Sequence, residues 1–249
     1  MSFDACAAIV EKGDPQRFMA TMACSVDARR VLFPLYAFNV QVARAPWVTE
    51  EPMIAEMRLQ WWRDALEEIA EGRAVRKHEV TTALADILDV DGAKALDRLV
   101  ASRRWDVYKD TFEDAGHFQE YLEATAGELM WQAARSLGAN DASREGVMAY
   151  GSATGLARYL VAVPELESKG RKPLVDGRSE AIAELARAAL AKLDPALKQT
   201  LPKRARAALV ESWETVPLLR QIERQPERVA QGAVGLSPFR SKFRLLRST

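Results

Sequence analysis

Apolar residues recur at intervals of three and four along nearly the whole chain, and this spacing constrains the fold more than any other feature. Between residues 27 and 45 it is carried by Val31, Leu35 and Phe38, and between residues 53 and 71 two adjacent stripes form a wide apolar arc. An amphipathic helix shows this period, whereas a half-buried strand alternates every second residue. The pattern predicts an all-α protein in which the second of these helices is buried on most sides.

Capping and breaking residues set the expected boundaries. Asp27 is a candidate N-cap of the first helix and Pro46 its stop, while Pro34 should kink the helix or mark its first turn. Residues 164–178 are rich in charge, Pro and Gly and are predicted to be a linker. Further helices are predicted at residues 78–88, 91–109, 114–137, 141–163, 179–193 and 203–224.

Length, composition and charge favour one globular domain. The 249 residues are 48% hydrophobic, which suffices for a sizeable core. We expect a single all-α domain over residues 1–249, of which the C-terminal third, about residues 178–249, is the less certain part. Lys plus Arg and Asp plus Glu number 35 each, so the net charge is zero. This balance argues against a nucleic-acid binder that works by bulk electrostatics.

Several functional classes find no support in the residues. Cys6 and Cys24 are the two cysteines and no Cys/His cluster accompanies them, so zinc is not expected. His78 and His117 have no serine or cysteine partner that suggests a nucleophilic triad. The chain starts with early acids and no long apolar run, and no stretch reaches the length of a membrane span. We therefore expect a cytoplasmic protein.

Three acids spaced four apart, Asp106, Asp110 and Asp114, raise the question of a metal site. Carboxylates at this spacing on one helix share a face and could hold a divalent cation. However, Thr111 followed by Asp114 resembles a capping box, which would begin a new helix and separate the acids. We favour the capping interpretation and expect no metal site here.

Four longer motifs point to a family. They are, in chain order, LYAFNVQVA from Leu35, RLQWWRDALEEI from Arg58, YLEATAGELM from Tyr121 and GLARYLVAVPELESKGRKPLV from Gly155. Together they resemble the squalene/phytoene synthase family of head-to-head prenyl transferases, over about residues 14–175. The resemblance implies an isoprenoid-synthase-like helical bundle around a central apolar cavity. From the apolar arcs and the motif order we expect helices 27–45 and 141–163 to line this cavity and to be antiparallel or nearly so.

In active members of that family, two acid-rich helix segments bind Mg²⁺, which holds the diphosphate of the substrate. The outer acids of the first segment would fall at Ala43 and Trp47, and those of the second at Ala162 and Leu166. Glu165 is the carboxylate left in the second motif. Metal ions stabilise the leaving diphosphate, so the loss of both clusters should cost at least about 10⁴-fold in rate. The resemblance thus implies a retained scaffold, a lost Mg²⁺ site and no expected cofactor.

One branch of the family fits better than the rest. LYAFNVQVA, RLQWWRDAL and the ending GRKPL closely resemble mitochondrial complex I assembly factors of this family, which are regarded as non-catalytic. This implies a pseudoenzyme whose partners are complex I subunits or other assembly proteins. Two alternatives stay open: a prenyl transferase with a degenerate metal site, and a protein that binds an isoprenoid, another lipid or a quinone. A cavity filled by Trp and Leu side chains favours assembly, and an open apolar tunnel favours the alternatives.

The resemblance also assigns roles around the cavity. Tyr36, Phe38, Asn39, Gly127 and Gly155 are assigned to its wall, with close helix packing as the alternative for Gly127. Trp47 either plugs the former metal mouth or fills the core. The residues that could hold an anion or ligand without a metal are Arg44, Arg158, Lys169, Arg171 and Lys172.

The C-terminal segment from Ser237 is basic and apolar. It carries Arg240, Lys242, Arg244 and Arg247 with no acid, interleaved with Phe239, Phe243, Leu245 and Leu246. Such a mixture suits an anionic membrane surface or an acidic partner, and would place the protein peripherally at the inner face of the membrane. The alternative is a disordered or docked terminus, and both stay open.

Overall fold

The computed structural model describes residues 2–248, and within them every regular element is a helix, so the all-α class is confirmed. The longer helices are α1 (Ser2–Gly13), α2 (Pro15–Met22), α3 (Val26–Arg44), α4 (Pro52–Ala70), α5 (Glu79–Ala85), α6 (Val90–Ser102), α7 (Ala115–Leu122), α8 (Glu128–Ser136), α9 (Arg144–Ser168), α10 (Ser179–Ala191), α12 (Thr215–Arg224) and α14 (Pro238–Ser248). The shorter pieces are η1 (Ala45–Trp47), η2 (Arg103–Asp106), the π-helix η3 (Glu123–Gly127), η4 (Asp141–Ser143), α11 (Leu197–Thr200), η5 (Ala205–Ser212) and α13 (Glu227–Ala230).

Helix α3 carries the first motif, and a serine caps its N-terminus. The Ser25 hydroxyl accepts a hydrogen bond from the backbone N–H of Ala28 at 3.4 Å. The prediction that Asp27 is the N-cap is therefore wrong. Asp27 lies in the first turn, where the partial positive charge of the helix end stabilises its negative charge. The helix continues through the buried Pro34 and stops at Arg44, two residues before Pro46. The predicted boundaries are confirmed within one residue.

Other predicted boundaries need correction. Helix α6 ends at Ser102 and is followed by η2, and the span 203–224 divides into η5 and α12. Helix α9 continues through Pro164 to Ser168, so the first part of the predicted linker is helical. A proline removes one helical hydrogen bond and crowds the preceding turn. Helix α13 packs against α9, and a methyl group added at Gly232 would lie 3.7 Å from the Pro164 ring.

Helices α1 and α2 were not anticipated from the apolar spacing. The Asp14 side chain caps α2 by accepting a hydrogen bond from the backbone N–H of Arg17 at 2.9 Å, and Pro15 occupies the first turn. This combination of an acidic cap and an early proline is a helix start signal. Helix α2 packs against both α3 and η5, so it joins the N-terminal part of the chain to its last third.

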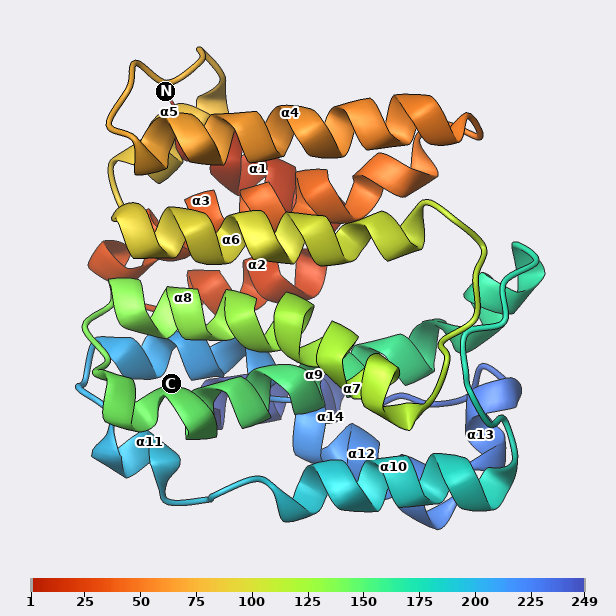
Figure 1. The fold of residues 1–249 in the computed structure, drawn as a ribbon. Coiled ribbons are helices and arrows are strands. Elements are labelled where there is room, and N and C mark those ends of the chain that lie inside the picture. The colour runs from red at the N-terminus through yellow and green to blue at the C-terminus, as the bar shows by residue number, and fades with distance from the viewer. Residues whose placement is uncertain (1, 249) are drawn as a thin grey trace.

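Figure 1 shows the long helices α4, α6, α8, α9 and α10 lying one below another with roughly aligned axes. Helix α4 packs on α6, α9 on η3, and α10 on α12. In this view α3 and α9 both run from left to right, and residues just beyond their C-terminal ends meet. The expectation that these two helices are antiparallel is therefore wrong.

The buried apolar side chains form two clusters. The larger cluster draws on α1, α3, α4, α6 and α8, with Trp131 and Phe38 among its largest members. The smaller cluster combines α7 and α9 with α10 and α12, through residues such as Leu160, Leu219 and Ile222. Residues from the C-terminal third thus contribute to both cores. The prediction of one domain over residues 1–249 stays a prediction.

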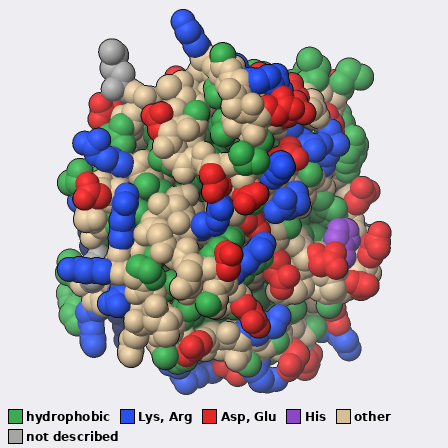
Figure 2. Space-filling model, turned by 60° about the vertical axis from the view of Figure 1, so that its left-hand side comes forward, with side chains coloured by type: hydrophobic (Ala, Val, Ile, Leu, Met, Phe, Trp, Pro, Cys, Tyr) green, Lys and Arg blue, Asp and Glu red, His purple; other side chains and the backbone are tan. Residues whose placement is uncertain are grey.

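The surface is polar and mixed in charge. In the view of Figure 2, Lys and Arg side chains gather toward the left-hand edge, while acidic and basic side chains are interspersed over much of the rest. In the part of the chain that the structure describes, no helix combines the length and the apolar character that crossing a membrane requires.

Candidate functional site

The two motif ends that should carry metal ligands meet around Trp47. The Lys169 Nζ atom lies 4.7 Å from the centroid of the Trp47 ring, and the Arg171 guanidinium carbon lies 4.5 Å from it. Cation–π contacts of this kind contribute about 0.5–1 kcal/mol each at exposed sites. Trp47 is 39% exposed, so the core-filling alternative is wrong. The indole is a platform for two cations, one turn beyond α3 and against the loop after α9.

The remaining positions of the two motifs offer little to a metal ion. Ala43, Ala162 and Leu166 are partly buried and have no side-chain oxygen. The Glu165 carboxylate is exposed and accepts a hydrogen bond from Lys169 Nζ at 2.6 Å. Across residues 2–248, no group of three or more His, Cys, Asp or Glu side chains could hold a metal ion. Mg²⁺ prefers several oxygen ligands, so the side chains around Trp47 do not fit it.

The predicted anion-binding residues are only partly brought together. Lys169 and Arg171 converge on Trp47, but Arg171 also donates to the backbone carbonyls of Asp106 and Tyr108, the latter at 3.1 Å. Lys172 is exposed on the same loop, and Arg44 is exposed on the last turn of α3. Arg158 lies elsewhere, on α9, where its side chain is partly buried.

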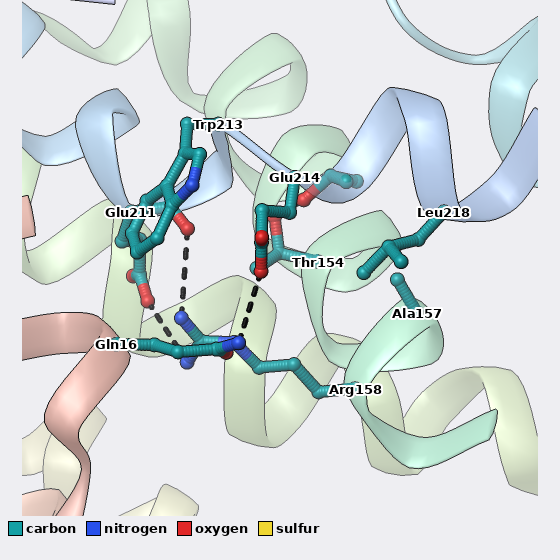
Figure 3. A pocket seen from close by; sticks show the side chains of 9 residues that line it. Gln16, Thr154, Ala157, Arg158, Glu211, Trp213, Glu214 and Leu218 are labelled. Atoms are coloured by element: carbon teal, nitrogen blue, oxygen red, sulfur yellow. Dashed lines mark hydrogen bonds and ion pairs between the residues drawn. The ribbon is translucent and has the colours of Figure 1, made fainter. Parts of the chain in front are cut away.

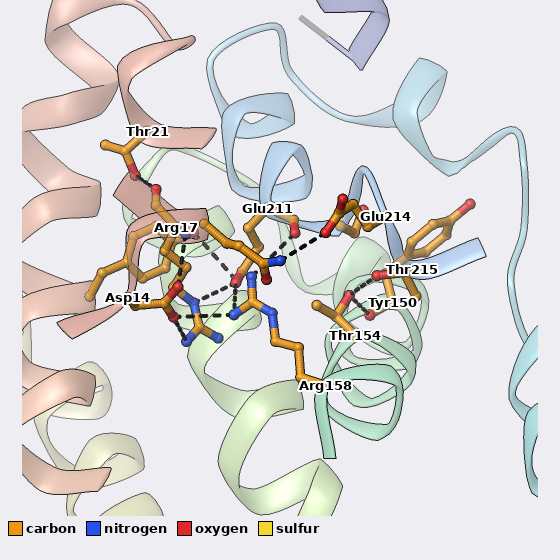
Figure 4. A network of polar contacts seen from close by, with 12 residues as sticks. Asp14, Arg17, Thr21, Tyr150, Thr154, Arg158, Glu211, Glu214 and Thr215 are labelled. Atoms are coloured by element: carbon orange, nitrogen blue, oxygen red, sulfur yellow. Dashed lines mark hydrogen bonds and ion pairs between the residues drawn. The ribbon is translucent and has the colours of Figure 1, made fainter. Parts of the chain in front are cut away.

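Between α3 and α9 lies an ionic network in which Arg17 and Glu211 are buried and Asp14 and Arg158 are partly buried (Figure 4). Arg17 of α2 donates through Nη1 to Asp14 at 2.9 Å and through Nε to Glu211 of η5. Arg158 of α9 contacts the same two carboxylates, at 3.4 Å to Asp14 and 3.3 Å to Glu211. The Tyr36 hydroxyl of α3 donates to Glu211 at 3.4 Å, and the Arg17 guanidinium lies over the Tyr36 ring. Two cations and two anions thus balance each other where α2, α3, α9 and η5 meet.

Burial and charge act on each member of this network. Burial disfavours the charged form of Arg17, but the carboxylates of Glu211 and Asp14 outweigh it and hold the Arg17 pKa above its ordinary value. At Arg158 burial dominates, and with the like charge of Arg17 it lowers the pKa. Burial, together with the Glu211 carboxylate, raises the Tyr36 pKa well above its ordinary value. Both arginines contact the same two carboxylates, and the role of Arg158 in binding an external anion stays a prediction.

The open apolar cavity expected between α3 and α9 is not found at this place. A pocket beside the network has a volume of only about 10 Å³, roughly the space that one water molecule needs. Its lining mixes polar and apolar side chains and includes Gln16, Arg158 and Glu214, with Gln16 donating to Glu214 at 2.9 Å (Figure 3). The physical reason is that Arg17 and Glu211 reach into the space from α2 and η5. Charged side chains therefore occupy the space between α3 and α9 where the apolar cavity was expected.

Two of the predicted wall residues serve close helix packing instead. A methyl group added at Gly127 would lie 2.7 Å from Ser152 Oγ, and one added at Gly155 would lie 2.5 Å from the Cβ of Ala126. Both glycines therefore let η3 approach α9, which confirms the packing alternative for Gly127 and corrects the cavity role of Gly155. Tyr36, Phe38 and Asn39 are buried. Phe38 packs edge-on against Trp62, at 5.4 Å between ring centroids.

Hollows of ligand size lie at the surface. A groove of about 1190 Å³ follows the flank of α9 between α7 and α10, and its apolar lining includes Phe118, Leu156 and Leu185. A smaller pocket of about 430 Å³ lies between α3 and α4 and is lined by Ile54, Trp61 and other side chains. Neither contains the ionic network.

The most distinctive part of the site was not found from the sequence. Asp14 gave a local signal, because it precedes a proline and starts a helix, but Arg17 and Glu211 gave none. Among the acids that were considered, Asp106 is buried and accepts hydrogen bonds from Tyr121 and Arg103. Asp114 is the N-cap of α7, a role that had been assigned to Thr111. The expectation that a new helix begins there and separates the acids is confirmed.

Comparisons with known proteins agree with the fold. The family profile described as squalene/phytoene synthase matches residues 10–175. In fold, the chain is similar to a dehydrosqualene synthase, with a TM-score of 0.79 and 15% identity over 99% of this chain and 95% of that one. It is also similar to the squalene synthase HpnC from Alicyclobacillus acidocaldarius, with a TM-score of 0.75 and 18% identity over 91% of this chain and 94% of that one.

Curated relatives carry a different name. The NADH dehydrogenase (ubiquinone) complex I, assembly factor 6 homolog of Drosophila melanogaster is 30% identical over 167 residues, which are 64% of this chain and 50% of that protein. The assembly factor 6 of Mus musculus is 24% identical over 177 residues, 66% of this chain and 50% of its own length. The chain thus spans about half the length of the curated relatives it matches. Because the family profile covers most of its length, the chain belongs to the squalene/phytoene synthase family.

Proposed function

We propose that this chain is a non-catalytic member of its family that assists the assembly of respiratory complex I by binding complex I subunits or other assembly proteins. The observation that carries the proposal is the pair of cations, Lys169 and Arg171, over Trp47, where the family would place metal-binding acids. The names of the curated relatives support the assembly role. We propose that the protein performs this role in the cytoplasm, at the inner face of the membrane.

The chemistry of the family argues for the non-catalytic half of the proposal. Ionising an allylic diphosphate creates a highly charged leaving group, which metal ions stabilise by several kcal/mol. Around Trp47 the carboxylate of Glu165 is held by Lys169, and the motif positions Ala43, Ala162 and Leu166 carry no side-chain oxygen. A missing stabilisation of this size lowers the rate by at least about 10⁴-fold. The interior supports the same conclusion, because Arg17 and Glu211 occupy the space between α3 and α9.

A deletion strain with complementation tests the assembly role. Cells that lack the protein should contain less fully assembled complex I, measured by native gel electrophoresis and NADH oxidation in membranes. The parent sequence and a Glu165→Gln variant should restore assembly equally, because the proposal gives this carboxylate no catalytic task. Normal amounts of complex I in the deletion strain would overturn the assembly role.

A separate incubation tests the absence of prenyl transfer. The purified protein should not consume farnesyl or geranylgeranyl diphosphate, with or without Mg²⁺. A squalene-like or phytoene-like product that depends on Mg²⁺ and disappears in Glu165→Gln would overturn the non-catalytic proposal. The two experiments test separate parts of the proposal. Prenyl transfer would indicate an active enzyme, whereas normal complex I without prenyl transfer would indicate a non-catalytic protein with a different function.

One observation favours a second candidate function, the binding of a prenyl lipid or quinone. The groove of about 1190 Å³ beside α9 has an apolar lining that includes Phe118 and Leu156, and it is large enough for a sizeable ligand. Isothermal titration with a soluble short-chain ubiquinone tests this candidate. Saturable binding that Leu185→Glu abolishes would support it, and heat signals equal in parent and variant would exclude this groove.

A further inference from the structure

The C-terminal helix α14 contacts the body of the protein along one face. Leu245 packs against the larger apolar cluster, and the Ser241 hydroxyl accepts a hydrogen bond from Trp213 Nε1 at 3.3 Å. The Lys198 ammonium group donates to the backbone carbonyl of Ser248. Residues 241, 245 and 248 are spaced by four and three, so these contacts come from a single side of the helix. Helix α14 is therefore docked on one side, which agrees with the docked terminus considered in the sequence analysis. The membrane-binding alternative concerns its other side.

The opposite face of α14 presents large apolar side chains to solvent. Phe239 is 79% exposed and Phe243 is 51% exposed, and their rings stack with centroids 6.3 Å apart. Leu246 shares this face by its spacing and is 77% exposed. Single exposed apolar residues are ordinary, but two stacked phenyl rings in line with a leucine form a stripe.

Basic side chains flank this stripe. Lys242 lies on one side of it by helical spacing, and Arg240 and Arg247 lie on the other. The Arg247 guanidinium carbon is 5.8 Å from the Phe243 ring centroid, so a cation borders the apolar stripe directly. No acidic residue occurs from Ser237 to the end of the chain. A helix with an apolar face, basic flanks and no acids is complementary to a surface that is apolar inside and anionic outside.

We propose that α14 is a membrane-surface element that lies flat on an anionic bilayer. Phe239 and Phe243 would insert between the headgroups, while the flanking Arg and Lys side chains bind lipid phosphates. The docked face keeps the helix axis along the protein surface, so the body of the protein stays outside the bilayer. This inference does not depend on the assembly role or on the absence of catalysis.

A lipid surface explains the arrangement better than an acidic protein does. A salt-bridging partner would account for the basic flanks, but not for two exposed phenyl rings aligned between them. A second copy of α14 is disfavoured, because two such helices would bring the basic flanks of both copies together. A bilayer supplies both the apolar layer and the anionic phosphates.

Vesicle co-sedimentation of the 249-residue protein tests the proposal. The parent should bind vesicles made of equal parts phosphatidylcholine and phosphatidylglycerol, bind pure phosphatidylcholine vesicles weakly, and be released by high salt, because exposed charges are screened. The double variant Arg240→Gln/Lys242→Gln should bind the anionic vesicles about 30-fold more weakly, from the usual contribution of two basic residues near such a surface. The double variant Phe239→Ser/Phe243→Ser should lose about tenfold or more.

Matched variants elsewhere on the surface control for charge and hydrophobicity. Lys94→Gln/Arg98→Gln removes one exposed Lys and one exposed Arg from α6. Met53→Ser/Met57→Ser removes two side chains that are 75% and 67% exposed on α4. Both control variants should bind anionic vesicles like the parent. Thermal melting of every variant checks that the fold is retained, and the charge variants keep the test valid if the Phe variants unfold.

Three outcomes would overturn the proposal. The first is a parent protein that does not bind the anionic vesicles even at low salt. The second is equal loss of binding in the α14 variants and their controls, which would indicate diffuse attraction. The third is capture of a soluble acidic polypeptide such as polyglutamate by α14 with no vesicle binding, which would assign the helix to a protein partner. Selective loss of vesicle binding in both α14 variants is the expected result.

Discussion

At the scale of single residues, Glu211 decides whether the buried Arg17 and the partly buried Arg158 are neutralised. It is 3% exposed and contacts Arg17 and Arg158 together. Replacing it by Gln keeps the size of the side chain but leaves Asp14 as the carboxylate that both guanidiniums share. Removing one partner of a buried ion pair costs about 3–5 kcal/mol, because an uncompensated charge remains inside. We expect Glu211→Gln to lower the free energy of unfolding by about that amount, measured by urea denaturation.

Glu214→Gln is the matched control for this prediction. Glu214 lies three residues further along and bonds to Gln16 in an exposed position. Its replacement should change the free energy of unfolding by less than about 0.5 kcal/mol. Equal effects of the two substitutions would show that the network is solvated and contributes little.

The same network predicts a dependence of stability on acid pH. Burial raises the Asp14 pKa, but the charges of Arg17 and Arg158 outweigh it and hold the pKa below its ordinary value of 3.8. A carboxyl whose pKa is lower in the folded state stabilises the fold above its unfolded pKa, and this stabilisation is lost as the pH falls through the folded pKa. The free energy of unfolding should therefore drop below pH 3.8 more steeply in the parent than in Asp14→Asn. Identical pH profiles of parent and variant would contradict the linkage.

Single residues also show where sequence reasoning reaches its limit. The apolar periodicity placed Phe38 and Tyr36 on a buried helix, and both are buried. The family resemblance marked Trp47 as unusual, and the structure gives it two cationic neighbours. The pairing of Arg17 with Glu211 could not be predicted, because the two residues lie far apart in the chain and no local pattern links them. Charge pairing across the fold depends on packing that periodicity does not describe.

At the scale of elements, the contact between η3 and α9 depends on glycines. A methyl group at Gly151 would lie 2.7 Å from the backbone oxygen of Ala126 and 2.8 Å from the Cα of Gly127. Backbone atoms cannot move away without shifting a whole helix, so Gly151→Ala should destabilise the protein by about 1–3 kcal/mol. In an open helix the same change would stabilise by up to about 1 kcal/mol, so the sign itself is the test. Thermal and urea unfolding measure it.

Gly177→Ala provides the comparison. An added methyl group there meets nothing within 4 Å, and the residue lies in an exposed loop. Its effect should be small and neutral to stabilising, through the lower entropy of the unfolded chain. A Gly151→Ala variant as stable as Gly177→Ala would show that the two elements can separate at no cost.

Most helices could be predicted from the sequence, but their ends and their directions could not. Pro164 was expected to begin a linker, yet α9 passes through it, because packing outweighs one lost hydrogen bond. Helices α3 and α9 run in parallel because of the overall arrangement of the helices. The apolar stripe of a single helix does not indicate the direction in which it runs relative to another helix. The segment that forms α14 was noted for its composition but not predicted to be a helix, and its docked face became visible only through Ser241 and Leu245.

At the scale of the whole molecule, the C-terminal third supplies side chains that complete the interior formed by the first two thirds of the chain. The family match ends at residue 175, but Glu211 and Trp213 of the later segment reach into the interior, and Leu219 and Ile222 complete the smaller core. A chain that ends at residue 177 would lose these side chains and leave Arg17 and Arg158 with one partly buried carboxylate, that of Asp14. If residues 1–249 form a single domain, as predicted, they should unfold together in one cooperative transition.

We expect the chain of residues 1–177 to show no cooperative thermal transition and to bind an apolar dye such as anilinonaphthalene sulfonate, because both cores would be exposed along one side. The full-length protein should unfold in one transition when followed by circular dichroism and by tryptophan fluorescence. Addition of a separately produced fragment of residues 178–249 should restore a cooperative transition, because that fragment supplies Glu211 and the missing apolar side chains. A truncated chain that melts as sharply as the full-length protein would establish residues 1–177 as an independent domain, with the last third an appendage.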